Sequence, residues 1–276
     1  MNTTIINICV RSLPRCLAFI LCCLELANAQ SPVQQKHIIS TAELSGLFHN
    51  SEQQQEKGVY FDVLAKILDE TGLKNSFEII VMPMKRAKMG FINHQYACYS
   101  PGLDTFDSQT ESNRLKDVLV STPLNKAIVR VVSAKHKLVI KGIEEIGSDD
   151  LISMVRGTPL SLEMREAAKR AGQLFFVNSE VENITMLQSG RVDHLFVFYP
   201  DALFAYKKLG ITEHFPYARQ FAPLVIDDTV TCHKDYASAF ALINKKIKQY
   251  QRDGTLKRIL GDFYMIDSPY MDFSVK

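Results

Sequence analysis

The sequence predicts an α/β protein with two sheets of mostly parallel strands, each flanked by helices. Two observations indicate this fold class. Short runs rich in β-branched and aromatic residues alternate along the chain with longer segments of helical periodicity. The series begins again near Ile143, and further strand-like runs follow the second series before the C-terminal helical segments. We therefore expect two lobes, with the end of the chain returning to the first.

The first 29 residues have the features of a secretory signal peptide and are set apart from the fold. Arg11 and Arg15 precede an apolar run at 16–24, and the Ala-Asn-Ala sequence at 27–29 has the small residues of a cleavage site. The run is too short to cross a bilayer, which needs roughly 20 apolar residues. We expect export to the periplasm with cleavage after Ala29.

The first series of strands and helices is expected between residues 37 and 132. Gly72 is expected to end the first helix, and Pro83 to end the second strand. We expect strands at 37–40, 77–82, 96–100 and 127–132, and helices at 62–71 and 85–93.

The second series is expected from residue 151 onward. Gly172 and Gly190 follow its helices as stop signals. Strands are expected at 151–155, 173–177, 192–198, 221–226 and 229–232, and helices at 160–171, 181–189, 236–252 and 256–263.

The composition argues against several classes of function. The formal net charge is only +2, which gives no electrostatic reason to expect binding to nucleic acid or to an anionic membrane. The seven histidines have no metal-ligand spacing, and no nucleophile lies in a recognisable catalytic motif. We therefore expect no metal site, no cofactor and no enzymatic activity. Four of the six cysteines lie in the predicted signal peptide, which leaves Cys98 and Cys232.

Short motifs along nearly the whole chain carry a family resemblance. In order they are Gly58–Leu64, Met82–Arg86, Thr110–Arg114, Ser121–Pro123, Val155–Thr158, Leu187–Asp193, Ile243–Lys245 and Asp253–Leu256. No single motif is specific, but their order and spacing resemble those of the family 3 extracellular solute-binding proteins. This family includes the periplasmic receptors of polar amino acid ABC transporters.

The resemblance implies the type II periplasmic-binding-protein fold, in which two lobes are joined by a two-strand hinge, here near 125–133 and 222–229. Lobe 1 would comprise residues 30–128 and 226–276, and lobe 2 residues 129–225. Such a receptor closes around a small polar solute, works as a monomer and presents the solute to an ABC permease or a sensor protein. The family topology would also bring Cys98 and Cys232 onto neighbouring strands, which leaves their pairing open.

The resemblance places Arg114 at the arginine that holds the ligand's carboxylate. A planar guanidinium suits this role because it donates two parallel hydrogen bonds to a carboxylate. The alternative is a surface arginine on a polar loop. Ser100 and Gly102 are also ligand candidates, because they lie at the carboxyl end of a predicted strand, where ligands of open α/β sheets bind.

Two further candidates each have a structural alternative. Thr158 is expected at the start of a helix, where it either helps to bind an anionic group or only caps that helix. Arg86 either reaches the rim of the cleft or pairs with an acidic residue on the surface.

One departure from the family pattern bears on the ligand. Phe198 stands where these receptors usually have an aspartate that holds the ammonium group of an amino acid. We therefore expect Arg114 to bind a carboxylate or another anion, while Phe198 and Tyr199 form an apolar wall. An ammonium group would lack a facing carboxylate, which argues against an α-amino acid ligand. This argument fails if Asp201 enters the cleft.

Two other functions use the same scaffold. A dehydratase similar to the periplasmic enzymes that act on prephenate or arogenate would need an acid or base in the cleft, and Glu180 and Glu182 are the nearest candidates. An accessory protein that reports a ligand to a sensor kinase is the other alternative. Asp62 and Asp193 are interpreted as structural, because each lies at an element boundary with backbone donors to satisfy.

Overall fold

The computed structural model describes residues 35–44, 46–48, 57–102 and 117–267. Contacts divide the chain into residues 1–35 and a compact unit of residues 36–276, which is the unit described below. The predicted signal peptide and Arg114 lie outside the described residues. Within the described part of the chain, no helix is both long and apolar enough to span a membrane.

The first sheet has the strand order β2-β1-β3-β10-β4. Strand β1 pairs in parallel with β2 and β3, whereas β10 runs antiparallel to β3 and β4. The strands are β1 (His37–Ala42), β2 (Phe77–Met82), β3 (Cys98–Ser100), β4 (Val118–Val120) and β10 (Thr231–His233).

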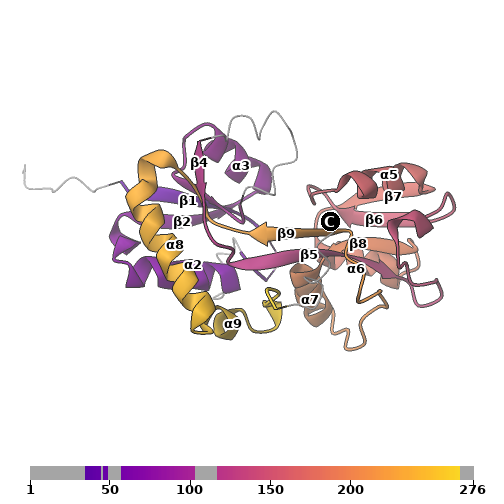
Figure 1. The fold of residues 1–276 in the computed structure, drawn as a ribbon. Helices are drawn as coiled ribbons and strands as arrows, with labels where there is room; N and C mark the ends of the chain where they lie inside the picture. Colours follow the sequence, from indigo (N-terminus) through magenta and orange to yellow (C-terminus); the bar gives the residue numbers. More distant parts are fainter. Residues whose placement is uncertain (1–34, 45, 49–56, 103–116, 268–276) are drawn as a thin grey trace, which may run out of the picture. The chain divides into compact units, whose positions relative to one another are not determined.

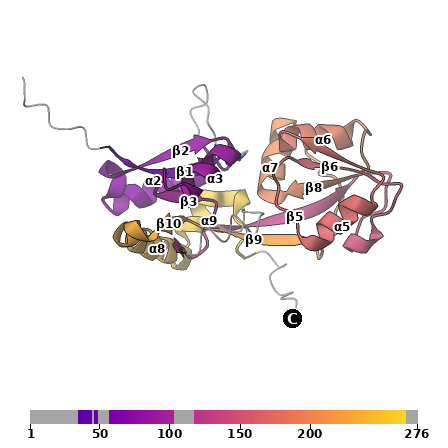
Figure 2. The same cartoon turned by 90° about the horizontal axis from the view of Figure 1, so that it is seen from above.

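Helices pack on both faces of this sheet (Figures 1 and 2). One face packs against α2 (Val59–Glu70), α8 (Ala237–Arg252) and α9 (Thr255–Leu260) through a large apolar cluster. The other face packs against α3 (Met84–Ile92) through a smaller cluster. Three short 3₁₀ turns complete this part: η1 (Leu73–Asn75), η4 (Lys234–Tyr236) and η5 (Gly261–Phe263).

The second sheet has the strand order β7-β6-β8-β5-β9. Strand β6 pairs in parallel with β7 and β8, and β5 is antiparallel to β8 and β9. The strands are β5 (Asn125–Ser133), β6 (Leu151–Val155), β7 (Gln173–Val177), β8 (His194–Phe198) and β9 (Leu224–Asp228). Helices α6 (Glu180–Gln188) and α7 (Tyr199–Lys208) cover one face, and α5 (Leu162–Arg170) and the 3₁₀ turn η3 (Ile143–Glu145) the other.

Strand β8, at the centre of the second sheet, is buried on both faces, which explains its unbroken apolar run at 195–198. Leu195 and Val197 pack with α6 and α7, whereas Phe196 and Phe198 pack on the side of α5. This alternation follows from the two-residue period of a strand.

Strands β5 and β9 are the connections between the two sheets. Their pairing runs from Asn125 opposite Asp228 to Val129 opposite Leu224. Strand β4 precedes β5 and strand β10 follows β9, and both of these belong to the first sheet. The chain therefore passes between the sheets along this antiparallel pair (Figure 1).

A disulfide joins Cys98 on β3 to Cys232 on β10, with the two Cα atoms 4.0 Å apart. The two residues lie directly opposite each other in the antiparallel register of these strands. The bond therefore ties the returning C-terminal part of the chain to the first series of strands.

Three differences from the expected elements concern the candidate site. Helix α7 and the short strand β4 were not expected. Helix α5 begins at Leu162, with Ser161 as its N-cap, whose side chain accepts a hydrogen bond from the Met164 amide. The expectation that Thr158 starts or caps this helix is therefore wrong, because Ser161 supplies the capping oxygen.

Candidate functional site

A cavity of about 390 Å³ lies at the carboxyl ends of strands from both sheets. Its lining residues share one position, the end of a parallel strand or the segment that follows it, where open α/β sheets bind ligands. From the first sheet they are Glu43, Leu44, Pro83, Met84 and Pro101. From the second they are Val155, Arg156, Thr158, Pro159, Asn178, Ser179, Glu180, Phe198 and Asp201.

Asp201 is the most unusual of these residues. It lies in the first turn of α7, its exposed fraction is 6%, and its Oδ1 atom has no hydrogen-bond partner among the described residues. Burial raises the pKa of Asp201 well above its ordinary value, and repulsion by Glu180 and Asp228 adds to this effect. A buried polar atom without a partner is costly, which marks this oxygen as a contact point for a bound group.

Glu180 is a second buried carboxyl in the same cavity, with an exposed fraction of 3%. Its Oε1 atom accepts a hydrogen bond from the Phe198 amide at 3.0 Å, and its Oε2 atom accepts one from Asn183 Nδ2 at 2.9 Å. Burial raises the pKa of Glu180 to about 7, although both hydrogen bonds act in the opposite direction. Glu180 is thus held in one orientation by α6 and β8.

Charges around the cavity are predominantly acidic. Glu43 is a third carboxylate in the lining, and it is exposed. Arg156 is the single cationic side chain among the described lining residues, and it is also exposed. Its guanidinium lies 5.9 Å from the centre of the Phe176 ring. Among the described residues, the buried part of the cavity therefore contains carboxyl groups without a facing cation.

The structure brings two of the predicted ligand residues, Thr158 and Phe198, into the cavity lining. Ser100 is fully buried next to Pro101, which lines the cavity, and the Ser100 Oγ atom has no hydrogen-bond partner among the described residues. Arg86 is exposed on α3 and is not in the lining.

Gly102 has a packing role. Its φ angle is +109°, and a Cβ atom at this position would lie 2.1 Å from Thr229 Oγ1. Only glycine fits here without displacing the link between β9 and β10.

The expectation for Tyr199 is wrong. Its ring packs in the apolar cluster between the second sheet and α6 and α7, and its hydroxyl donates a hydrogen bond to the Tyr217 hydroxyl at 3.1 Å. The Arg130 guanidinium lies 5.8 Å from the ring centre. Tyr199 is therefore a core residue and not a wall of the cavity.

The argument against a cationic ligand group also fails, because Asp201 enters the cavity. Helix α7 begins directly after Phe198, and residues three apart on a helix lie on the same side. Asp201 is three residues after Phe198 and so shares its side, whereas Tyr199 turns into the core. The helical spacing of apolar residues after Tyr199 could have revealed this arrangement.

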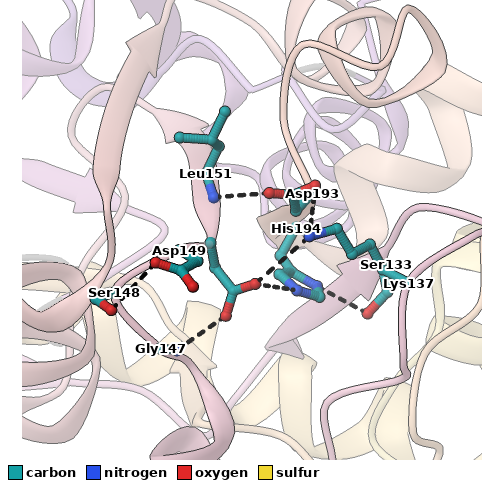
Figure 3. Close-up of polar contacts among 9 residues, drawn as sticks. Ser133, Lys137, Gly147, Ser148, Asp149, Leu151, Asp193 and His194 are labelled. Atoms are coloured by element: carbon teal, nitrogen blue, oxygen red, sulfur yellow. Dashed lines mark hydrogen bonds and ion pairs between the residues drawn. The ribbon is translucent and has the colours of Figure 1, made fainter.

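A second polar cluster contains a serine, a histidine and an aspartate in contact (Figure 3). His194 Nδ1 lies 3.0 Å from Ser133 Oγ, and His194 Nε2 lies 3.5 Å from Asp150 Oδ1. Ser133 and His194 are buried, and the cluster lies at the start of β6 and β8, whereas the cavity lies at their opposite ends. Burial lowers the pKa of His194. Ser133 is fully buried and out of reach of a substrate. The cluster therefore stabilises the ends of three neighbouring inner strands of the second sheet, β5, β6 and β8.

Asp193 belongs to this cluster and has the structural role expected of it. Its Oδ2 atom accepts a hydrogen bond from the Leu151 amide at 3.0 Å, and Lys137 Nζ lies 3.1 Å from its Oδ1 atom. Among the residues that the structure describes, no group of three or more His, Cys, Asp or Glu side chains is arranged to hold a metal ion.

Comparisons of the sequence find no matching family model and no matching curated protein. The fold does have solved relatives. A probable amino-acid ABC transporter extracellular-binding protein from Bacillus subtilis superposes with a TM-score of 0.62 at 18% identity, covering 83% of this chain and 99% of the other. An ancestral amino acid-binding protein, described as a precursor of cyclohexadienyl dehydratase, gives 0.62 at 17% identity, covering 82% and 95%.

A histidine kinase sensor domain with similarity to periplasmic binding proteins gives a TM-score of 0.63 at 10% identity, covering 84% of this chain and 97% of the other. These superpositions cover nearly the full length of each relative, and the two sheets and their helices agree with the predicted fold class. The chain has the periplasmic-binding-protein fold.

Proposed function

We propose that this protein is a periplasmic solute-binding receptor that closes around a small polar, amino-acid-like solute. The observation that carries the proposal is the cavity at the carboxyl ends of both sheets, with the buried and unpartnered Oδ1 atom of Asp201 in its lining. A small number of placed polar groups in a concave site is typical of a ligand pocket.

The connections between the sheets support hinge closure. In this proposal lobe 1 comprises residues 30–128 and 226–276, lobe 2 comprises residues 129–225, and the antiparallel pair β5 and β9 bends between them. A solute that contacts both lobes would favour the closed form, because it binds that form better.

The location and the partners are inferred from sequence and fold together. The N-terminal segment has the features of a cleaved signal peptide, which would deliver the receptor to the periplasm. The relatives include a transporter's binding protein and a kinase sensor domain. An ABC permease is the partner that we propose, with a sensor protein as the alternative.

A thermal-shift screen tests the receptor proposal. Amino acids, dicarboxylates, aromatic acids, polyamines and short peptides would be added to the wild type, to Arg114→Ala and to Arg86→Ala as the matched control. A ligand that binds only the native state stabilises it by about 2.7 kcal/mol at a hundredfold excess over Kd. We expect an amino acid, whose carboxylate would contact Arg114, to stabilise the wild type and Arg86→Ala, and to lose this effect in Arg114→Ala. If no probe of any class stabilises the wild type, the proposal is wrong.

Glu180 favours one second candidate, a dehydratase of the cyclohexadienyl type. A buried carboxyl whose pKa is about 7 is suited to general acid catalysis near neutral pH, and Glu180 lines the cavity. A turnover assay with prephenate and arogenate separates the two functions. We expect no product from the wild type, whereas turnover that disappears in Glu180→Gln would establish the enzyme.

A further inference from the structure

The buried end of the cavity lacks one interaction partner. Asp201 Oδ1 is inaccessible to bulk solvent and has no hydrogen-bond partner among the described residues, although Asp201 lines a cavity large enough for a small solute. A carboxyl oxygen only accepts hydrogen bonds when it is ionised. The ionised form of Asp201 would therefore need a donor as its partner, and a cationic donor would bind it most strongly.

The neighbours of Asp201 also favour a cationic group at this end of the cavity, because they are acidic. Glu180 in the first turn of α6 and Asp228 at the end of β9 both repel a negative charge on Asp201. The Tyr60 hydroxyl on α2 donates a hydrogen bond to Asp228. Glu43, after β1, adds a further carboxylate to the cavity lining.

The cationic side chain in the described lining, Arg156, lies at the surface and not at the buried end of the cavity. Arg156 follows β6 and lines the cavity, but its side chain is exposed and lies beside the Phe176 ring. An anionic group at the buried end would meet Asp201 and Glu180 without a compensating charge, which is costly in a desolvated site. A cationic group at the buried end would form ion pairs with Asp201 and Glu180.

Resting on the proposed receptor function, we propose that the solute is bound through a cationic nitrogen group, a primary ammonium or a guanidinium, which is seated against Asp201 and Glu180 in exchange for a proton. This assignment differs from the family pattern, in which the ammonium-binding aspartate would occupy the position of Phe198.

The proton balance follows from the state of the empty site. Burial favours the protonated forms of both carboxyls in the empty cavity, because it raises the pKa of Glu180 to about 7 and that of Asp201 well above its ordinary value. When the cation binds, a carboxyl gives its proton to the solvent and forms the ion pair. Affinity then rises with pH, by about tenfold per pH unit for each proton released below the pKa.

Isothermal titration calorimetry on the full-length chain tests this exchange. Agmatine, putrescine and L-arginine serve as cationic probes, and succinate and benzoate as anionic ones, between pH 5.5 and 8.5. The titrations at pH 7.5, where both compounds buffer, would be repeated in phosphate and in Tris, because the difference in heat between buffers of different ionisation enthalpy counts the protons released.

Two variants remove the carboxyls and two remove matched charges elsewhere. Asp201→Asn and Glu180→Gln alter the site. Asp227→Asn on β9, at a half-buried position beside Lys126, and Glu182→Gln on α6, at an exposed position, make the same chemical changes outside the lining. We expect cationic probes to bind the wild type and both controls with proton release, and Asp201→Asn to weaken binding by about a hundredfold at pH 8.

The outcomes separate this inference from the receptor proposal. Binding of an anionic probe, or cation binding that is independent of pH and equal in Asp201→Asn, would overturn the cation exchange and leave the receptor function standing. If no probe of either charge binds the wild type, both proposals fail. Proton-linked cation binding that is lost in Asp201→Asn, while Asp227→Asn behaves as wild type, supports both.

Discussion

The Tyr60 hydroxyl donates a hydrogen bond to Asp228 Oδ2, across 168 residues of sequence. Tyr60 lies on α2, which packs on the first sheet, and Asp228 ends β9, one of the two strands that connect the sheets. Both residues are buried. Burial, followed by the charge of Asp228, raises the pKa of Tyr60, so the hydroxyl stays a donor over the physiological range.

Replacing Tyr60 with phenylalanine is expected to lower the free energy of unfolding by about 1 to 3 kcal/mol, because the Asp228 carboxylate loses a buried donor. Urea unfolding measures this loss. Asp228→Asn in the Tyr60→Phe background should recover part of it, since an amide carries no charge. Tyr236→Phe is the control, because its ring lies at the surface end of the cluster with His37 and Phe77. An equal loss in both tyrosine variants would contradict this account.

The disulfide between Cys98 and Cys232 is expected to contribute about 2 to 5 kcal/mol to stability, because it closes a loop across a sequence separation of 134 residues. Reduction with dithiothreitol, or the double variant Cys98→Ser, Cys232→Ser, should therefore lower the melting temperature clearly. Thiol titration of the denatured protein produced without residues 1–29, which contain four further cysteines, should detect no free cysteine. Two free thiols before reduction would show that the pair is not oxidised.

The contribution of Glu180 to the stability of the unliganded protein is expected to fall as pH rises from 4.5 to 7. The pKa of Glu180 is raised from 4.5 to about 7 in the folded protein, so the stability gained from its protonation is fully present below pH 4.5 and is lost as pH rises to 7. The loss from this group is about 3 kcal/mol, at roughly 1.4 kcal/mol per pKa unit. Asp201 acts in the same direction.

Urea unfolding at pH 5, 6, 7 and 8 measures this slope. Glu180→Gln should flatten it, although the variant also disturbs the hydrogen bond to Asn183. Glu182→Gln on the same helix should keep the slope of the wild type. A slope in Glu180→Gln that equals the wild-type slope would rule out Glu180 as its source.

Ser161 and Thr158 are expected to have separate roles. Ser161→Ala should lower the free energy of unfolding by about 1 kcal/mol, because it removes the oxygen that caps α5. Thr158→Ala should leave stability within about 0.5 kcal/mol of the wild type. Because Thr158 lines the cavity, its removal should instead weaken solute binding. Denaturant unfolding measures the stability of both variants, and calorimetry measures their solute binding. A loss of stability in Thr158→Ala without one in Ser161→Ala would contradict these roles.

Much of the fold could be predicted because its strands are long apolar runs with clear stops. The strands at 77–82, 151–155 and 173–177 have the expected bounds, since Pro83, Gly157 and Gly172 mark turns beside their apolar residues. Strand β4 was missed because three residues at a sheet edge give too little pattern.

The candidate site was harder to predict because its chemistry depends on side-chain direction. Glu180 and Asp201 come from two different helices, and only the fold shows that both are buried in one cavity. Placing them required the start of α7 to be known within one residue, because a shift of one position turns a side chain by about 100°. Sequence motifs located the loops around the cavity but could not show which way Tyr199 and Asp201 point.

The most direct test of the central claim, that the cavity is the solute site, is a titration with L-arginine after the cavity has been filled. Thr158→Trp places a large side chain in the lining, whereas Thr185→Trp makes the same change at an exposed position on α6. We predict one bound molecule per chain for the wild type and Thr185→Trp, and no binding to a folded Thr158→Trp. Unchanged binding in Thr158→Trp would place the solute elsewhere and contradict the account.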